Sequence, residues 1–204
     1  MIQWDAIVLA GGRAVRLGGI DKSGLVVRGR TLLDVALAAT ERAGRCVVVG
    51  PERSGLPSRV RSVVDDPPHA GTPYAVEVGL AALGDRVADF VAVVASDQPR
   101  ADDALAAVLG AVRPASAAEA WVATDPGGQS HALLAVYRTA ALARAIAEER
   151  AERGTPGRKL HTLLPRMEVQ RVHLFGYLCA DIDTPIDLLE HGVDPAFVLP
   201  ANVA

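Results

Sequence analysis

Short apolar runs alternate with segments of helical periodicity along most of the chain. The run Phe90–Ala95 has the uninterrupted, β-branched pattern of a central parallel strand. Similar runs predict strands at 5–10, 46–49, 60–65, 121–124, 131–137 and 169–174. Amphipathic spacing, with Thr31, Thr72 and Thr184 as N-caps, predicts helices at 32–43, 72–83, 103–112, 139–153, 160–164 and 185–191.

This alternation of strands and helices predicts a mostly parallel sheet with right-handed crossovers and helices on both faces. We therefore expect a three-layer α/β/α domain of Rossmann-like topology. No repeat or linker divides the chain, so residues 1–191 should form one domain and residues 192–204 a loosely held C-terminal tail. Ligands of such sheets bind at the carboxyl ends of the strands, which directs attention to residues 11–24, 50–53, 65–73 and 96–99.

Composition excludes several classes of protein. Half of the 204 residues are hydrophobic and the net charge is -3, which argues against a disordered chain and gives no case for binding nucleic acid or an anionic membrane. Cys46 and Cys179 lie too far apart for a zinc motif or a disulfide framework. The first apolar run is too short for a signal peptide or a membrane span, so we expect a soluble cytoplasmic protein.

The basic residues are strongly biased towards arginine. Only Lys22 and Lys159 are lysines among the 21 basic residues. An ammonium group and a guanidinium fork are not interchangeable, so each lysine is a candidate for a role that arginine cannot fill. For Lys159, chance is an equal alternative.

The loop after the first strand carries the most informative motif, LAGGRAVRLGGIDK at residues 9–22. Its four glycines allow backbone N–H groups to approach an anion closely, and Arg13, Arg16 and Lys22 supply positive charge. The spacing matches neither a Walker A loop nor the G-x-G-x-x-G dinucleotide fingerprint. The loop therefore predicts a triphosphate site of another kind.

This stretch resembles the opening signature LAGG-x-x-x-R-[ML]-G-G-x-D-K of the molybdenum cofactor guanylyltransferase family, the MobA-like NTP transferases. The resemblance continues, roughly to residue 191, at Val47–Pro51, Asp65–Pro68, Gly71–Pro73, Ser96–Pro99 and Asp181–Leu188. It implies a nucleotidyltransferase that moves GMP from GTP to the phosphate of molybdopterin, or of its molybdenum-loaded form, with Mg²⁺ and release of pyrophosphate. GTP and molybdopterin are the small-molecule substrates that it implies, with molybdoenzymes or a chaperone as protein partners.

The same resemblance, with the chemistry of nucleotidyl transfer, suggests roles for individual residues. Asp97, which follows the most strand-like run, is the expected first Mg²⁺ ligand and Asp181 the second. Lys22, with Arg16 beside it, would neutralise the departing pyrophosphate, so Arg16, Lys22 and Asp97 are the expected catalytic residues. The expected nucleotide contacts are Leu9, Ala10, Gly11, Gly12, Lys22, Gly50 and Asp66. A phosphate dianion as acceptor would need no general base.

Three departures from the family pattern keep other functions open. Ala14-Val15 replaces a small hydroxyl residue, Thr72-Pro73 replaces a Gly-Pro turn, and aspartates at 181 and 183 replace asparagines, as in cytidylyltransferase relatives. The alternatives are a nucleotidyltransferase that uses CTP or a sugar-phosphate acceptor, and a nucleotide-binding homologue without catalysis. A glycosyltransferase D-x-D motif at Asp181–Asp183 is disfavoured by its position after every major strand.

The remaining polar residues carry weaker signals. Arg53 is a weaker candidate for a contact, since an arginine in a loop is usually solvated. We expect His69 to be an ordinary loop residue, and Trp4 and Trp121 to pack in the core or at its rim. The acceptor-binding half, between residues 127 and 177, has no motif with a readable mechanism. Possible contacts there are Gln129, Ser130 and Arg138.

Overall fold

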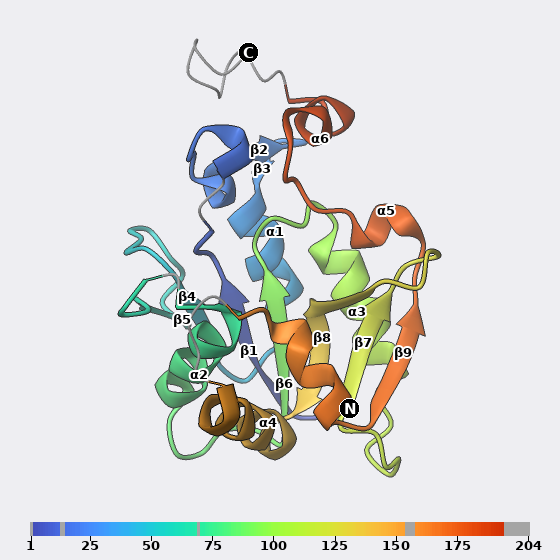
Figure 1. The fold of residues 1–204 in the computed structure, drawn as a ribbon. Coiled ribbons are helices and arrows are strands. Elements are labelled where there is room, and N and C mark those ends of the chain that lie inside the picture. The colour runs from blue at the N-terminus through green and yellow to red at the C-terminus, as the bar shows by residue number, and fades with distance from the viewer. Residues whose placement is uncertain (1, 13–14, 69, 154–157, 194–204) are drawn as a thin grey trace.

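The computed structural model describes residues 2–12, 15–68, 70–153 and 158–193 (Figure 1). The predicted roles of Arg13, Ala14 and His69, and the tail beyond Val193, lie outside these residues. The predicted three-layer α/β/α architecture is confirmed. A seven-stranded sheet in the order β5-β4-β1-β6-β8-β7-β9 forms the middle layer. Its strands are β1 (Trp4–Leu9), β4 (Cys46–Val49), β5 (Val60–Val63), β6 (Phe90–Ala95), β7 (Ala120–Thr124), β8 (Ser130–Arg138) and β9 (Val169–His173).

Only β8 runs against its neighbours; the other strands of the sheet are parallel to one another. The chain builds β4 and β5 on one side of β1 and then returns to place β6 on the other side. The strand order therefore reverses between β1 and β6. In open α/β sheets such a switch point leaves a crevice at the carboxyl ends of the strands.

Helices cover both faces of the sheet. One face packs against α1 (Leu32–Ala39), α3 (Ala101–Ala111) and α5 (Gly176–Cys179), and the other against α2 (Thr72–Leu83), α4 (Thr139–Arg153) and the 3-10 helix η3 (Leu160–Arg166). Alternate residues of β1 divide between the two cores, with Ala6 and Val8 in the first and Ile7 and Leu9 in the second. Burial on both faces explains why the strands are continuous apolar runs.

A third apolar cluster lies above the sheet, where the sequence predicts only a loop. Leu17, Leu25 and Val27 pack there against Ile182 and Leu188. Residues 15–31, which follow β1, contain the 3-10 helices η1 (Val15–Leu17) and η2 (Lys22–Gly24) and a hairpin formed by β2 (Val26–Val27) and β3 (Arg30–Thr31). The cluster fixes the loop that follows β1 against the late helix α6 (Pro185–Glu190).

Helix ends agree with the sequence where a side chain caps them. Thr31 and Thr184 each form the expected N-cap with a capping box. The expected end of the first helix at Ala43 is wrong: α1 ends at Ala39, and the buried Thr40 hydroxyl donates to the carbonyls of Ala36 and Leu37. The expected cap at Thr72 is also wrong, because Gly71 occupies the N-cap position of α2.

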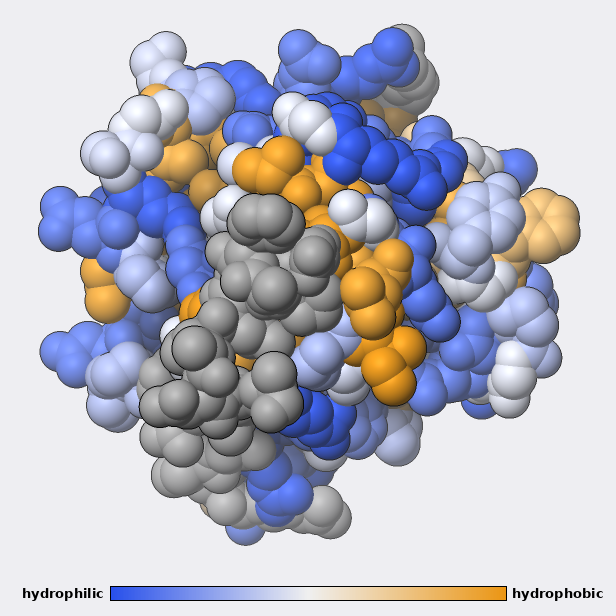
Figure 2. All heavy atoms as spheres, turned by 90° about the horizontal axis from the view of Figure 1, so that it is seen from above, coloured by the Kyte–Doolittle hydropathy of each residue, from blue (hydrophilic) through white to orange (hydrophobic). Residues whose placement is uncertain are grey.

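The end of the molecule that carries α6 exposes apolar side chains. Figure 2 looks down on this end and shows apolar atoms gathered near its centre, bordered by hydrophilic residues. Large hydrophobic residues that are exposed include Val26 on β2, Ile186 and Leu189 on α6, and Phe175 and Tyr177 at the start of α5. Within the part of the chain that the structure describes, no helix has the length and apolar character needed to cross a membrane.

Close packing of α2 on β1 gives a test of the fold. A Cβ atom at Gly79 would lie 2.7 Å from Cγ2 of the buried Ile7, so Gly79→Ala overpacks the core. We expect it to lower the free energy of unfolding by about 1–2 kcal/mol, after allowing for the better helix propensity of alanine. Gly110→Ala on α3 is the control, since its Cβ would meet nothing within 4 Å. Urea denaturation checks both, and equal stability of the two variants would contradict the packing.

Candidate functional site

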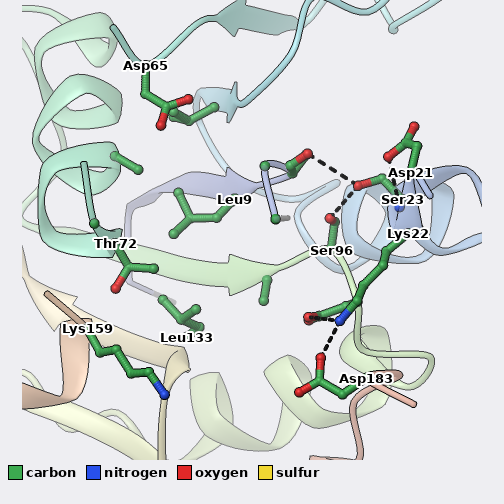
Figure 3. A pocket seen from close by; sticks show the side chains of 18 of the residues that line it. Leu9, Asp21, Lys22, Ser23, Asp65, Thr72, Ser96, Leu133, Lys159 and Asp183 are labelled. Carbon is green, nitrogen blue, oxygen red and sulfur yellow. Dashed lines mark hydrogen bonds and ion pairs between the residues drawn. The ribbon is translucent and has the colours of Figure 1, made fainter. Parts of the chain in front are cut away.

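A cleft of about 650 Å³ opens at the switch point of the sheet (Figure 3). Leu9, Val49 and Ala95 line its floor, each at the carboxyl end of a strand, and the sheet register places these three residues side by side. Most of the residues predicted from the sequence line it, namely Leu9, Ala10, Gly11, Gly12, Arg16, Lys22 and Asp97. Gly50, Asp66 and Asp181 are not among its lining residues.

Lys22 lies between two carboxylates that come from distant parts of the chain. Its Nζ atom bonds to Oδ1 of Asp183 and lies 3.8 Å from Oδ2 of Asp97. The lysine side chain is only 13% exposed, so these carboxylates partly replace its water. The loop after β1, the end of β6 and the segment before α6 therefore meet at one ammonium group (Figure 3).

Backbone hydrogen bonds hold the late aspartates at this place. The Ile182 N–H donates to the Asp97 carbonyl at 3.0 Å, and the Ile182 side chain is fully buried. Oδ2 of Asp187 accepts from the N–H groups of Asp183 and Thr184, which fixes the turn into α6. The carboxylates at 181 and 183 are thus set beside Asp97 by the backbone as well as by Lys22.

The carboxylates of this cluster disfavour one another's ionisation. Burial raises the pKa of Asp97 to about 6; Lys22 opposes this rise, and Asp181 and Asp183 add to it. Burial and the Asp183 charge likewise raise the pKa of Asp181. Among the described residues, no group of three or more His, Cys, Asp or Glu side chains forms a ready-made metal site. The cluster therefore carries excess negative charge, but it does not supply a complete set of protein ligands for a metal ion.

Two serines join the loop after β1 to the end of β6. The hydroxyls of Ser23 and Ser96 share a hydrogen bond of 2.7 Å, and both residues are buried. The Ser96 N–H also donates to the Leu9 carbonyl at 3.0 Å. Ser23 was not predicted as a site residue, since it lies one position beyond the signature, which ends at Lys22. This pair sets the residues on either side of it, Lys22 and Asp97, next to each other.

Arg53 is not solvated, contrary to expectation. Its guanidinium bonds to both carboxylate oxygens of Asp21, at 2.7 and 2.8 Å, and donates to the Ala10 carbonyl at 3.1 Å. The hydrogen bond from Arg53 lowers the pKa of Asp21. Arg53 therefore bonds to both ends of the first loop. The pattern of residues did not indicate this role, because Ala10 and Asp21 are more than 30 residues away from Arg53 in sequence.

Gly50 and Asp66, two of the expected nucleotide contacts, lie beside the cleft without lining it. Gly50 has φ 152°, and a Cβ there would lie 2.8 Å from the Ala10 carbonyl carbon, so this glycine lets the two loops pass closely. Asp66 is exposed and its carbonyl accepts from the Tyr74 hydroxyl. The carboxylate that lines the cleft beside Gly11 is that of Asp65.

Of the wall opposite Lys22, only Thr72 belongs to a stretch that the sequence analysis singled out. Thr72, Leu133 and Lys159 line it (Figure 3). Arg158, next to Lys159 in sequence, also lines the cleft. Of the possible contacts in the later half, Gln129 and Ser130 line a neighbouring cavity. Arg138 does not reach either cavity: it packs over the rings of Phe90 and Trp121 and donates to backbone carbonyls at Pro114, Ser116 and Ala118.

Comparison with known proteins identifies the family. A family model described as the MobA-like NTP transferase domain matches residues 6–166. The chain belongs to the MobA-like NTP transferase family. It is therefore a nucleotidyltransferase. The match ends before Asp181 and Asp183. It is 36% identical over 142 residues to the molybdenum cofactor guanylyltransferase of Acidiphilium cryptum, a match that covers 67% of each chain.

Solved structures of proteins with different names share the fold. The molybdopterin-guanine dinucleotide biosynthesis protein A of Archaeoglobus fulgidus superposes with a TM-score of 0.62 and 18% identity, over 92% of this chain and 96% of that one. The 2-C-methyl-D-erythritol 4-phosphate cytidylyltransferase of Thermus thermophilus gives 0.66 and 21%, over 91% and 95%. Fold alone therefore does not separate enzymes named for guanine from those named for cytosine nucleotides.

The contacts of Arg53 with the first loop lead to a prediction about nucleotide binding. Arg53→Ala removes three hydrogen bonds to the first loop, and we expect nucleotide affinity to fall about 10-fold because the free loop must then be ordered on binding. Arg53→Lys should recover only part of it, since an ammonium cannot form the two-pronged contact. Calorimetric titration measures both.

Arg61→Ala is the matched control, because Arg61 donates only to the Ala82 carbonyl at the surface among the bonds described. Wild-type affinity in Arg53→Ala would show that these contacts do not order the loop for binding.

Proposed function

We propose that the chain transfers GMP from GTP to the phosphate of molybdopterin, or of its molybdenum-loaded form, with release of pyrophosphate. The observation that carries the proposal is the contact of Lys22 with Asp97 and Asp183 at the switch point of the sheet, beside the glycines of the first loop. A cation and carboxylates beside this glycine-rich loop would suit a triphosphate that binds together with a metal ion. The similarity to the Acidiphilium cryptum guanylyltransferase supports guanine as the base.

The carboxylate cluster fits a magnesium ion. The ammonium of Lys22 contacts two carboxylates, those of Asp97 and Asp183. Burial raises the pKa values of Asp97 and Asp181, and the neighbouring carboxylates add to the rise. Mg²⁺ binds through one or two carboxylates with phosphate oxygens and water completing its shell, so no full protein cage is needed. Asp97 and Asp181 would hold it, while Asp183 pairs with Lys22. When bound, the ion would polarise the phosphates and neutralise developing charge.

The residues of the cleft then have defined tasks. An oxygen of the acceptor phosphate attacks the α-phosphorus, the bond from that phosphorus to the bridging oxygen breaks, and pyrophosphate leaves with the electron pair. Gly11 and Gly12 let the phosphates approach the backbone, and Lys22 and Arg16 neutralise the leaving group. A phosphate dianion carries no proton that must be removed. Asp65, at the far side of Gly11, would contact the ribose or base.

A second candidate is transfer of CMP from CTP. Aspartates at 181 and 183, where the guanylyltransferase pattern has asparagines, favour it, as does the shared fold of the Thermus thermophilus cytidylyltransferase. A nucleotide-binding protein without catalysis is a third candidate, because the hydroxyl of the first loop is replaced. These candidates differ in nucleotide preference and in turnover, which are separable measurements.

Calorimetric titration with GTP, CTP, ATP and UTP, each with and without Mg²⁺, separates the candidates. We expect binding that is selective for GTP and strengthened by Mg²⁺. Asp97→Asn should abolish the strengthening by Mg²⁺ and leave binding of the nucleotide without Mg²⁺ largely unchanged, because the variant removes the proposed metal ligand while Asp183 still pairs with Lys22. Lys22→Ala should weaken binding at least 10-fold in either condition.

Asp102→Asn is the control for Asp97→Asn, since Asp102 lies on α3 and pairs at the surface with Arg30. Selectivity for CTP would replace guanine by cytosine in the proposal. A response of Asp97→Asn to Mg²⁺ equal to that of the wild type would remove Asp97 from the metal site.

A further inference from the structure

The second lysine of the chain lies across the cleft from the first. Lys22 is on the wall formed by η2 and the end of β6, and Lys159 projects into the same cleft from the segment before η3 (Figure 3). No carboxylate of the described residues lies within ion-pair distance of Lys159. The two ammonium groups therefore differ in their surroundings: one is balanced by carboxylates and the other faces the cleft without them.

Lys159 also borders a second cavity. This cavity, of about 930 Å³, adjoins the cleft at Lys159 and extends beneath η3 towards β8 and β9. Polar side chains in its lining include Gln129, Ser130, His161 and Arg171, and Met167 adds an apolar surface. A molecule bound at Lys159 could thus extend away from the nucleotide cleft into a separate space with hydrogen-bonding groups.

Hydrogen bonds fix the backbone on both sides of Lys159. The Thr72 N–H donates to the Arg158 carbonyl at 2.9 Å, and the Thr72 hydroxyl accepts from the Leu160 N–H at 2.6 Å. The hydroxyl that does not cap α2 therefore ties residues 158 and 160 to the start of that helix. Lys159, between them, has an exposed side chain on an anchored backbone.

Arg158 adds a second, oriented cation to this wall. Its Nε atom lies 3.6 Å from Oε1 of Glu149, a residue of α4 that is 1% exposed and that also bonds to Arg166 at 2.9 Å. Because the buried carboxylate is held by Arg166, it serves as a fixed anchor for the Arg158 side chain. Arg158 itself lines the cleft.

We propose that Arg158 and Lys159 bind the phosphate monoester of the acceptor, and that the adjoining cavity takes the rest of that molecule. The inference rests on the proposed transfer to a phosphate acceptor. Such a reaction must bring a phosphate dianion up to a triphosphate, and two anions repel unless cations lie on both sides. Lys22 would neutralise the nucleotide's phosphates and the leaving pyrophosphate. Lys159, on the other wall, would bind the phosphate that attacks.

Thr72 is then a positioning residue. Where the family pattern has glycine, this chain has a hydroxyl whose contact with the Leu160 N–H sets the Lys159 backbone. Removal of the hydroxyl by Thr72→Val should raise the KM for the acceptor with little change in that for the nucleotide. Thr72→Ser, which keeps the hydroxyl, should have the acceptor KM of the wild type.

Steady-state kinetics with molybdopterin tests the assignment. Lys159→Gln should raise the acceptor KM at least 10-fold and leave the Kd for GTP, measured by calorimetry, within 2-fold of wild type. Arg144→Gln, which removes a cation of α4 that pairs with Glu119, is the control and should change neither. A rise in the Kd for GTP with an unchanged acceptor KM would overturn the proposal, because Lys159 would then serve the nucleotide.

Binding of inorganic phosphate tests the anion site without relying on turnover. Calorimetry is carried out on protein saturated with a GTP analogue whose α,β-bridging oxygen is replaced by methylene. We expect phosphate to bind the wild type and the Arg144→Gln control, and to bind Lys159→Gln and Arg158→Gln at least 5-fold more weakly. Equal binding by all four proteins would overturn the site. Loss in the two variants, with no transfer to molybdopterin by the wild type, would leave the anion site standing and remove the proposed function.

Discussion

The ammonium group of Lys22 is the contact on which the site depends. It joins the loop after β1 to Asp97 at the end of β6 and to Asp183 before α6, segments that are up to 161 residues apart in sequence. A partly buried ammonium requires such partners, and the partners outnumber it. In the proposed function, a divalent cation would offset the excess negative charge of this cluster.

The sheet supplies the geometry that this electrostatic cluster needs. Because β1, β4 and β6 are parallel and in register, their last residues lie side by side and the loops that follow them meet. Close approach of those loops is possible only because Gly50 has no side chain to collide with Ala10. The Ser23–Ser96 and Arg53–Asp21 hydrogen bonds then lock the first loop over the sheet. The opposite wall is set independently, by Thr72 and the segment that follows α4.

Features encoded by neighbouring residues were predictable from the sequence. Strand runs, the N-caps at Thr31 and Thr184 and the glycine-rich loop each depend on a few adjacent residues. Features made by distant residues were not: the contacts of Arg53 with the first loop and the Thr72 contact with Leu160 join segments that only the fold brings together.

Short irregular elements were missed for a local reason. The β2–β3 hairpin has two-residue strands, too short to show alternation, and its turn is Arg28-Gly29 rather than the usual Asn-Gly, although both residues have positive φ. Adjacent aspartates at 65 and 66 could not be told apart by pattern, because only the path of the turn decides which of them lines the cleft.

The most direct test of the account is a transfer assay with α-³²P-labelled GTP, Mg²⁺ and molybdopterin, in which the labelled product and the released pyrophosphate are both quantified. The account predicts one labelled dinucleotide per pyrophosphate released, with GTP preferred over CTP, and no product from Asp97→Ala. Wild-type protein that binds GTP but forms no labelled dinucleotide, or that forms as much with the Asp97→Ala substitution as without it, would contradict it.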